Sequence, residues 1–258
     1  MPRDDGMTAV AAPSARSDAA DPVAALFDAA VRRYVPAGRF AVGFARGKLR
    51  HDPVFVALLR RGLVPDGARL LDLGCGQGVL LALLVAACEQ HRAGCWPAGW
   101  AAPPSHPTLR GIEVLRADVR RARLALGGDA EIEEADLRVA RVTPSDVIVL
   151  LDVVHYLEPP AQERLLTAVA GALAPGGLFL MRVGDVTAGI PALLTRIIDR
   201  LVTLARGSGL HPFHCRTIPQ WVAALERLGF AVDVEPKSEG TPFANVLLVA
   251  RKHRERRE

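Results

Sequence analysis

A short glycine-rich segment carries the clearest chemical signal in this 258-residue sequence. Residues 70–80 read LLDLGCGQGVL: an apolar run that contains Asp72, then Gly74, Gly76 and Gly78, then a long apolar stretch. This order predicts a strand, a tight turn and a helix. Because glycine has no Cβ, a ligand can lie against bare backbone where the helix begins. We expect this loop to hold a nucleoside-like cofactor.

The spacing of the glycines separates two classes of cofactor. The dinucleotide fingerprint G-x-G-x-x-G needs glycine or alanine at position 79, where this chain has Val79. The sequence therefore disfavours a nicotinamide or flavin. Strand-to-helix turns often use glycine for structural reasons alone, so the neighbouring strand ends must test the interpretation.

Acidic residues stand at the ends of the next two predicted strands. Residues 108–114, TLRGIEV, form an apolar strand that includes Glu113, whose carboxylate suits a ribose diol because it can accept both hydroxyl hydrogens. The segment AEIEEADLR then places Asp136 and Leu137 after a third short strand. Carboxyl ends of parallel strands meet at one edge of a sheet, so we expect these residues beside the glycine loop.

Two more apolar runs predict the fourth and fifth strands. Residues 146–157, DVIVLLDVVHYL, form a buried strand that closes on Asp152 and His155. Residues 173–182, LAPGGLFLMR, predict a helix end, a Pro-Gly-Gly turn and a strand that ends at Arg182.

In this order the landmarks resemble the class I S-adenosylmethionine-dependent methyltransferases over about residues 63–252. The resemblance implies an α/β, Rossmann-like fold: a seven-stranded, mostly parallel sheet of order 3-2-1-4-5-7-6, with helices on both faces and an N-terminal helical extension. It implies S-adenosylmethionine as the cofactor, with Asp72 near its ammonium group and Asp136 near its adenine. The cofactor-binding residues it implies are Asp72, Gly74, Cys75, Gly76, Gly78, Glu113, Asp136, Leu137 and Asp152.

The same patterns divide the chain. We expect a disordered leader at 1–21, a helical lid segment at 22–64, the methyltransferase domain at 65–252 and a basic tail at 253–258. Gly78 and Glu113 are 35 positions apart, which is too long for a compact strand-helix-strand unit and predicts an insertion at about 89–107. A second insertion at about 187–212 includes an amphipathic helix over 187–206.

Some of these segments admit two interpretations. Tyr34, Phe40 and Phe44 are either lid residues or ordinary helix packing. The first insertion holds two Trp, four Pro and two His, and is either a structural loop, which we favour, or a substrate-facing flap. Its cysteines and histidines match no familiar zinc spacing, so we expect no metal.

Methyl transfer to oxygen or nitrogen needs alignment and a route for the acceptor's proton. His155 is the first candidate base, because it follows the fourth strand near the expected methyl group. His214, in a Pro-containing loop after the second insertion, is the other catalytic candidate. Arg182 and Asp185 are expected to face the acceptor.

The bulk properties favour a soluble, cytoplasmic protein with a packed core. Hydrophobic residues make up 50% of the chain, and no apolar helical stretch reaches the length of about 20 residues that a membrane span needs. Residues 251–258 carry +3 of the formal net charge of +4, so the body is close to neutral and a nucleic-acid partner is not favoured. A homodimer through the 187–206 helix stays open.

The pattern as a whole is similar to the small-molecule branch of the family, which implies O-methylation of a small hydroxylated metabolite. The stretch 38–55, GRFAVGFARGKLRHDPVF, also resembles methyltransferases of bacterial aryl-polyene pigment pathways, which implies an aromatic acceptor. Two alternatives remain: a cofactor-binding protein of this fold without turnover, and an RNA methyltransferase that uses the basic tail.

Overall fold

The computed structural model describes residues 21–185, 214–236 and 245–254. The predicted leader, the 187–206 helix and the end of the basic tail lie outside the described residues.

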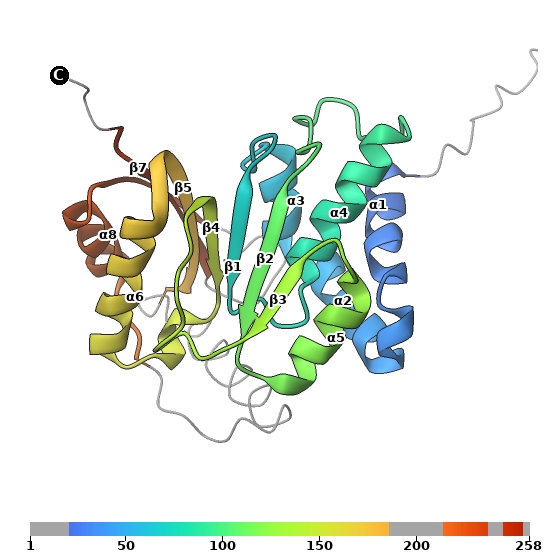
Figure 1. The fold of residues 1–258 in the computed structure, drawn as a ribbon. Helices are drawn as coiled ribbons and strands as arrows, with labels where there is room; N and C mark the ends of the chain where they lie inside the picture. Colours follow the sequence, from blue (N-terminus) through green and yellow to red (C-terminus); the bar gives the residue numbers. More distant parts are fainter. Residues whose placement is uncertain (1–20, 186–213, 237–244, 255–258) are drawn as a thin grey trace, which may run out of the picture.

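A seven-stranded sheet runs through the molecule in the order β3-β2-β1-β4-β5-β7-β6 (Figure 1), which confirms the predicted order. The strands β1 to β5 pair in parallel, whereas β7 pairs antiparallel with both β5 and β6. Their bounds are β1 Arg69–Leu73, β2 Thr108–Glu113, β3 Glu131–Glu134, β4 Ser145–Leu151, β5 Leu173–Gly184, β6 Phe230–Pro236 and β7 Asn245–Lys252.

Helices cover both faces of this sheet (Figure 1). One face packs against α1 to α5, and the other packs against α6 and α8. The helices are α1 Pro22–Arg32, α2 Arg39–His51, α3 Pro53–Arg60, α4 Val79–Arg92, α5 Arg116–Leu126, α6 Pro159–Ala172 and α8 Ile218–Arg227, with short 3-10 helices η1 Val35–Ala37 and η2 Val154–Tyr156. The connection from β3 to β4, residues 135–144, contains turns instead of a helix.

Alternation along the strands divides the core into two clusters. Leu70 and Val147 face the α4 side, whereas Leu71 and Ile148 face the α6 side. Successive strand residues point to opposite faces, so a strand buried on both faces becomes apolar throughout. The long apolar runs of β1 and β4 have this origin.

The N-terminal helices belong to the first of these clusters. Leu26 of α1 and Leu58 of α3 are buried in the same core as most of α4. Phe40 is 60% exposed; it lies under the guanidinium of Arg121 from α5 and stacks on Phe44. Tyr34 is fully buried. These helices therefore form part of the packed layer, and a lid role for them remains a proposal.

The first insertion begins later than predicted, because α4 continues to Arg92. Residues 93–107 connect the end of α4 to the start of β2, at the edge of the sheet opposite the glycine loop (Figure 1). Trp96 donates its indole N–H to Ala101 O at 3.0 Å, and the Cys88 thiol donates to Pro104 O at 2.8 Å. This position favours the structural interpretation of the insertion over the flap.

The fifth strand also differs from its prediction. The Pro-Gly-Gly segment lies within the bounds of β5, which begins at Leu173, but residues 174–177 have no partner on β4 and Gly176 has a φ of +78°. A Cβ on Gly177 would lie 2.8 Å from Ala174 O and 2.9 Å from Asp146 O, so only glycine lets the backbones approach there. The pairing of β4 with β5 shifts register between Ser145 and Val147.

No helix among the described residues combines the length and the apolar character that crossing a bilayer requires.

Candidate functional site

The glycine loop lies between β1 and α4, at the edge of the sheet where β1 to β5 end, which we name the carboxyl edge (Figure 1). Gly74, Gly76 and Gly78 have φ angles of +74°, +56° and +74°, in the left-handed region that favours glycine. The amides of Gly74 and Cys75 donate to Ile112 O at 2.8 and 3.0 Å. These bonds fix the loop to the end of β2.

Close packing gives a second reason for two of the glycines. A Cβ on Gly74 would lie 2.5 Å from a methyl of Val153, and a Cβ on Gly78 would lie 2.8 Å from a methyl of Leu126. The sequence predicted bare backbone for a ligand at these positions. The structure shows that these two also let the loop contact its protein neighbours.

Two buried carboxylates meet beside this loop. Asp72 and Glu113, on neighbouring strands, are 4% and 7% exposed. Glu113 accepts hydrogen bonds from the amides of Gly76 at 2.9 Å and Leu115 at 2.8 Å. Burial and the negative charge of Glu113 raise the pKa of Asp72 to about 7. The predicted convergence of the glycine loop and Glu113 is therefore present.

The segment between α1 and η1 contacts the glycine loop through Tyr34. The Tyr34 hydroxyl donates to the backbone carbonyl of Gln77 at 2.8 Å, and both groups are buried. Within the described residues, neither side-chain atom of the Gln77 amide has a hydrogen-bond partner. Such buried amides are rare in folded proteins and mark a place where water or a ligand group belongs.

The end of β3 lies next to the end of β2. The amide of Ala135 donates to Glu113 O at 3.1 Å, which brings Asp136 and Leu137 to the carboxyl edge. Leu137 is buried, and Asp136 is partly buried and pairs with Arg138 at 3.1 Å. Both residues follow β3, the strand next to β2, and their predicted adenine-binding role stays a prediction.

On the other side of the glycine loop, Asp152 does not have an open carboxylate. Arg182 donates its Nε to Asp152 Oδ1 at 2.8 Å, and its Nη2 contacts the second oxygen. Although burial alone would raise it, the positive charges of Arg182 and Lys48 hold the pKa of Asp152 well below its ordinary value. The predicted cofactor role of Asp152 therefore competes with a structural one.

The two catalytic candidates lie on adjacent segments. His155 is in η2, and its carbonyl accepts a hydrogen bond from the amide of His214 at 2.9 Å. Gln162 donates its side-chain amide to His214 O at 2.7 Å and so fixes this pair of segments. Burial lowers the pKa of His155 to about 4, although Asp152 opposes the shift. His155 is therefore neutral at physiological pH.

These residues fit S-adenosylmethionine, which the family resemblance implies. A carboxylate offers about four acceptor positions. The two amides bound to Glu113 leave acceptor capacity for a ribose diol. In its ionised form, Asp72 would place a negative charge beside the loop, where the positive end of the cofactor is expected. The unpartnered Gln77 amide adds a buried polar group in the same loop.

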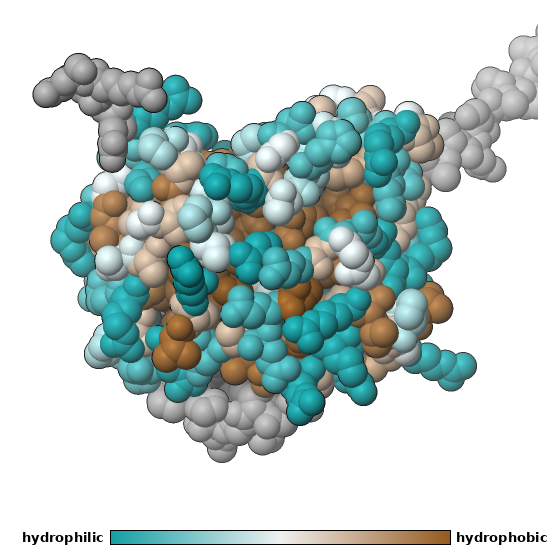
Figure 2. Space-filling view, viewed as in Figure 1, coloured by the Kyte–Doolittle hydropathy of each residue, from teal (hydrophilic) through white to brown (hydrophobic). Residues whose placement is uncertain are grey.

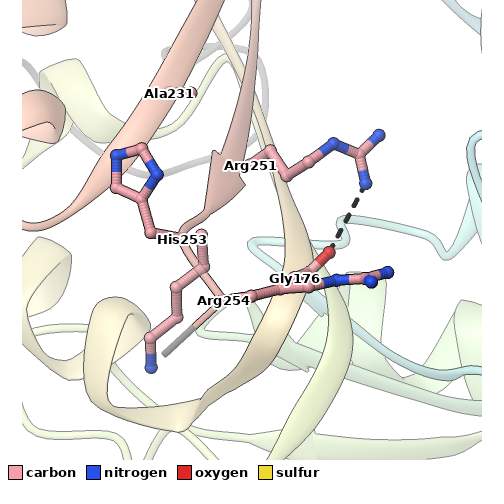
Figure 3. Close-up of a pocket in the computed structure, with 6 residues that line it drawn as sticks. Gly176, Ala231, Arg251, His253 and Arg254 are labelled. Carbon is pink, nitrogen blue, oxygen red and sulfur yellow. Dashed lines mark hydrogen bonds between the residues drawn. The ribbon is translucent and has the colours of Figure 1, made fainter. Parts of the chain in front are cut away.

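The opposite edge of the sheet carries a basic depression of about 380 Å³. Figure 3 shows Arg251 hydrogen-bonded to the Gly176 carbonyl, Arg254 beside it, and His253 turned away. Lys252 is not available there, because its Nζ donates to Ala170 O and Leu173 O at 2.6 and 2.8 Å. This depression lies at the start of β5 and the end of β7, away from the glycine loop.

Hydrophobic residues reach the surface near the middle of Figure 2, over the region of β1 to β3. That region has no crossover helix, since residues 135–144 form turns. Val114 and Val139, which follow β2 and β3, are 55% and 85% exposed.

Sequence reasoning missed the partners of Arg182. Lys48 and Asp52, from the N-terminal helices, complete an ion cluster with Arg182 and Asp152. We had expected Arg182 to face the acceptor, but its side chain is 1% exposed. The available signal was an arginine inside the apolar strand FLMRVG, because a buried guanidinium requires carboxylate partners.

Comparisons with known proteins agree with this geometry. A family model described as a methyltransferase domain matches residues 46–234. The chain is 32% identical over 177 residues to ribosomal RNA small subunit methyltransferase C of Pseudomonas aeruginosa. The aligned region covers 67% of this chain and 48% of that protein. The chain thus spans about half the length of the curated relatives it matches.

Solved structures share the fold. An O-methyltransferase family protein from Burkholderia thailandensis superposes with a TM-score of 0.58 at 19% identity, over 82% of this chain and 58% of that one. An S-adenosylmethionine-dependent methyltransferase from Mesorhizobium loti gives 0.54 at 24% identity, over 78% and 96%. The family match, the sheet order and the carboxyl-edge geometry together show that this chain belongs to the class I S-adenosylmethionine-dependent methyltransferases.

Proposed function

We propose that this protein transfers a methyl group from S-adenosylmethionine to an oxygen of a small hydroxylated metabolite. One observation supports the cofactor site most directly: the Gly76 amide lies 2.9 Å from the Glu113 carboxylate, beside buried Asp72. Three independent segments thus converge at the carboxyl edge, where open α/β sheets bind ligands.

The residues have separate tasks in this proposal. Glu113 accepts hydrogen bonds from the ribose diol, Asp72 attracts the ammonium group, and Asp136 with Leu137 borders the adenine. When bound, the cofactor supplies an electrophilic methyl group, and the protein contributes alignment and the exclusion of water. Gly74, Cys75, Gly76 and Gly78 provide the backbone surface.

The acceptor's proton needs a receiving group. His155 is neutral at physiological pH, so its imidazole can receive this proton. The Asp152 carboxylate is a poorer candidate, because it already accepts hydrogen bonds from Arg182. His214 is the second candidate base, because its backbone amide donates to the His155 carbonyl and so lies beside His155. An imidazole whose pKa is about 4 is a weak base, so it suits acidic hydroxyls such as phenols better than aliphatic alcohols.

The preference for a small acceptor rests on charge and on the resemblance of residues 38–55. Among the described residues, Arg251, Lys252 and Arg254 of the basic segment 251–258 lie at the edge opposite the proposed cofactor site. O-methyltransferase family members are among the fold relatives, although at this identity they support the fold alone. The resemblance of residues 38–55 to aryl-polyene pathway enzymes favours an aromatic hydroxyl.

The direct test measures S-adenosylhomocysteine formation from S-adenosylmethionine with a panel of phenols, aliphatic alcohols and total RNA. The proposal expects turnover with at least one phenol and loss of that turnover in His155→Ala. Binding of S-adenosylhomocysteine without turnover on any acceptor or in a cell extract would favour a non-catalytic cofactor-binding protein.

RNA methylation is the second candidate, supported by the rRNA methyltransferase relative and by the basic depression at Arg251 and Arg254. A protein that uses this depression for phosphate contacts should lose RNA affinity in the double variant Arg251→Gln, Arg254→Gln, and its binding should weaken steeply with salt. If the double variant retains RNA as the wild type does, the depression plays no part in RNA binding.

A further inference from the structure

The ion cluster of Lys48, Asp52, Asp152 and Arg182 joins two parts of the chain that are far apart in sequence. Lys48 and Asp52 come from α2 and from the residue before α3, whereas Asp152 follows β4 and Arg182 lies in β5. Arg182 Nη2 donates to Asp52 Oδ2 at 2.7 Å, and Arg182 Nη1 contacts Asp52 Oδ1. The guanidinium thus binds both oxygens of each carboxylate.

Charge in this cluster is balanced. Lys48 Nζ lies 3.1 Å from Asp52 Oδ2 and 3.5 Å from Asp152 Oδ2, so two cations face two carboxylates. The side chains of Arg182 and Asp52 are only 1% and 11% exposed. A buried ion pair contributes little net stability when complete, but removing one partner leaves a buried charge and is strongly unfavourable. The cluster therefore holds its segments together only as a complete set.

The Asp152 backbone needs such support. Asp152 has a φ of +60° and is the single non-glycine residue with positive φ among the described residues. Its amide also donates to Arg182 O at 3.3 Å. Strained residues of this kind persist where their surroundings hold them, and they cluster at functional sites.

The residues next to Asp152 connect the cluster to the cofactor loop. Val153 packs on the bare Cα of Gly74, with methyls only 2.5 and 2.9 Å from where a Cβ would be. His155 begins the segment that contacts His214. A displacement of Asp152 would thus reach the glycine loop through Val153 and the candidate base through His155.

We propose that this ion cluster is a clamp through which the N-terminal helices position the cofactor loop and the segment of His155. Arg182 is its central positioning residue, and Lys48 and Asp52 are the contributions of the helices. The positioning of the cofactor loop rests on the proposed function. The coupling between α2 and residues 152–157 does not require a bound cofactor and is measured on the protein without ligand.

The variant Asp52→Asn distinguishes the two roles of this residue, its negative charge in the ion cluster and its capping of α3. Asp52 caps α3, since its Oδ1 accepts from the Val54 amide at 3.2 Å, and asparagine caps helices as well as aspartate does. The variant therefore retains the cap and removes one negative charge from the cluster. Lys48→Met removes a cation from a side chain that is 37% exposed and is the milder variant. Arg69→Met is the matched control, because Arg69 binds both oxygens of Asp146 at the opposite edge of the sheet.

The experiment measures backbone hydrogen exchange by mass spectrometry and S-adenosylhomocysteine affinity by calorimetry on the full chain. We expect Asp52→Asn to speed exchange in both 39–51 and 152–157 by about tenfold, and to weaken the affinity by a similar factor. Lys48→Met should do the same to a smaller extent, and Arg69→Met should change neither segment.

Faster exchange in 39–51 alone, with unchanged exchange in 152–157 and unchanged affinity, would overturn the clamp and leave the cluster a packing feature. If Asp52→Asn does not fold, the same criterion applies to Lys48→Met. A wild type that does not bind S-adenosylhomocysteine would refute the proposed function, and the exchange results would still decide the clamp.

Discussion

Asp72→Asn tests the electrostatics of the proposed cofactor site. The folded protein raises the pKa of Asp72 from 3.8 to about 7, so the carboxyl group keeps its proton in the folded state while it is ionised in the unfolded state. This contribution to stability is complete below pH 3.8 and is lost as the pH rises to 7. Asparagine resembles the protonated acid and lacks this penalty.

The expected size follows from the shift. One pKa unit corresponds to about 1.4 kcal/mol, so ionising Asp72 costs the folded state up to about 4 kcal/mol above pH 7. At about 2–4 °C per kcal/mol for a chain of this size, Asp72→Asn should exceed the wild type in Tm by at least about 5 °C at pH 8. The difference should be much smaller at pH 5.

Two neighbours of Asp72 have pKa values raised away from this range. Burial and neighbouring charges raise the pKa of the Cys75 thiol well above its ordinary value, and burial raises that of Tyr34. The pH dependence between 5 and 8 therefore reports Asp72.

Ligand binding gives the second half of this test. The ammonium group of S-adenosylhomocysteine favours ionised Asp72, so wild-type affinity should rise between pH 6 and pH 8 with release of a proton. Asp72→Asn should bind more weakly and without that slope. Thermal unfolding and calorimetry at pH 5, 6, 7 and 8 measure both quantities. The reasoning fails if Asp72→Asn lowers Tm equally at all four values, or if wild-type affinity does not change with pH.

Three further variants probe the same edge. Gly74→Ala combines a positive φ with a Cβ 2.5 Å from Val153, so urea unfolding should show a loss of about 2–4 kcal/mol; a loss below 1 kcal/mol would contradict the packing. Tyr34→Phe leaves the buried Gln77 carbonyl without its donor and should cost about 1–2 kcal/mol in the same assay, whereas an unchanged midpoint would show that this bond is not needed. If His155 is the base, the acidic limb of kcat in the wild type should lie near pH 4, and His155→Gln should abolish it; a limb between pH 6 and pH 7 would assign the proton to another group.

The strands were predictable because they are buried on both faces, whereas the order of the sheet came from the family resemblance. Residues 70–73 are apolar except for Asp72, and residues 147–151 form an unbroken apolar run, which is typical of parallel strands covered by helices. The capping of α3 by Asp52 was also readable, since Asp-Pro is a common helix start. Local chemistry determines these features, so one sequence is enough.

Contacts between distant segments were not predictable. Nothing local indicates that Asp52 binds Arg182 across 130 positions, or that Tyr34 donates to Gln77. The extension of β5 back to Leu173, ahead of the Pro-Gly-Gly segment, was not predictable either, because it depends on the pairing of Leu173 with Ser145 of β4. The insertion begins at residue 93, four residues later than the predicted 89, because α4 continues to Arg92. The available signal for this helix end was Gly94, which follows the C-cap Ala93 with a φ of +73°.

Glu113→Gln tests the central claim most directly, by calorimetric titration with S-adenosylhomocysteine. Glu113 is buried between the Gly76 and Leu115 amides, and a glutamine there loses one acceptor oxygen and the charge. Glu226→Gln, an exposed position on α8, is the control for the same chemical change. The account predicts saturable binding by the wild type and the control, and affinity at least about tenfold weaker in Glu113→Gln. Wild-type protein that is folded yet binds no S-adenosylhomocysteine, or Glu113→Gln that binds it as the wild type does, would contradict the account.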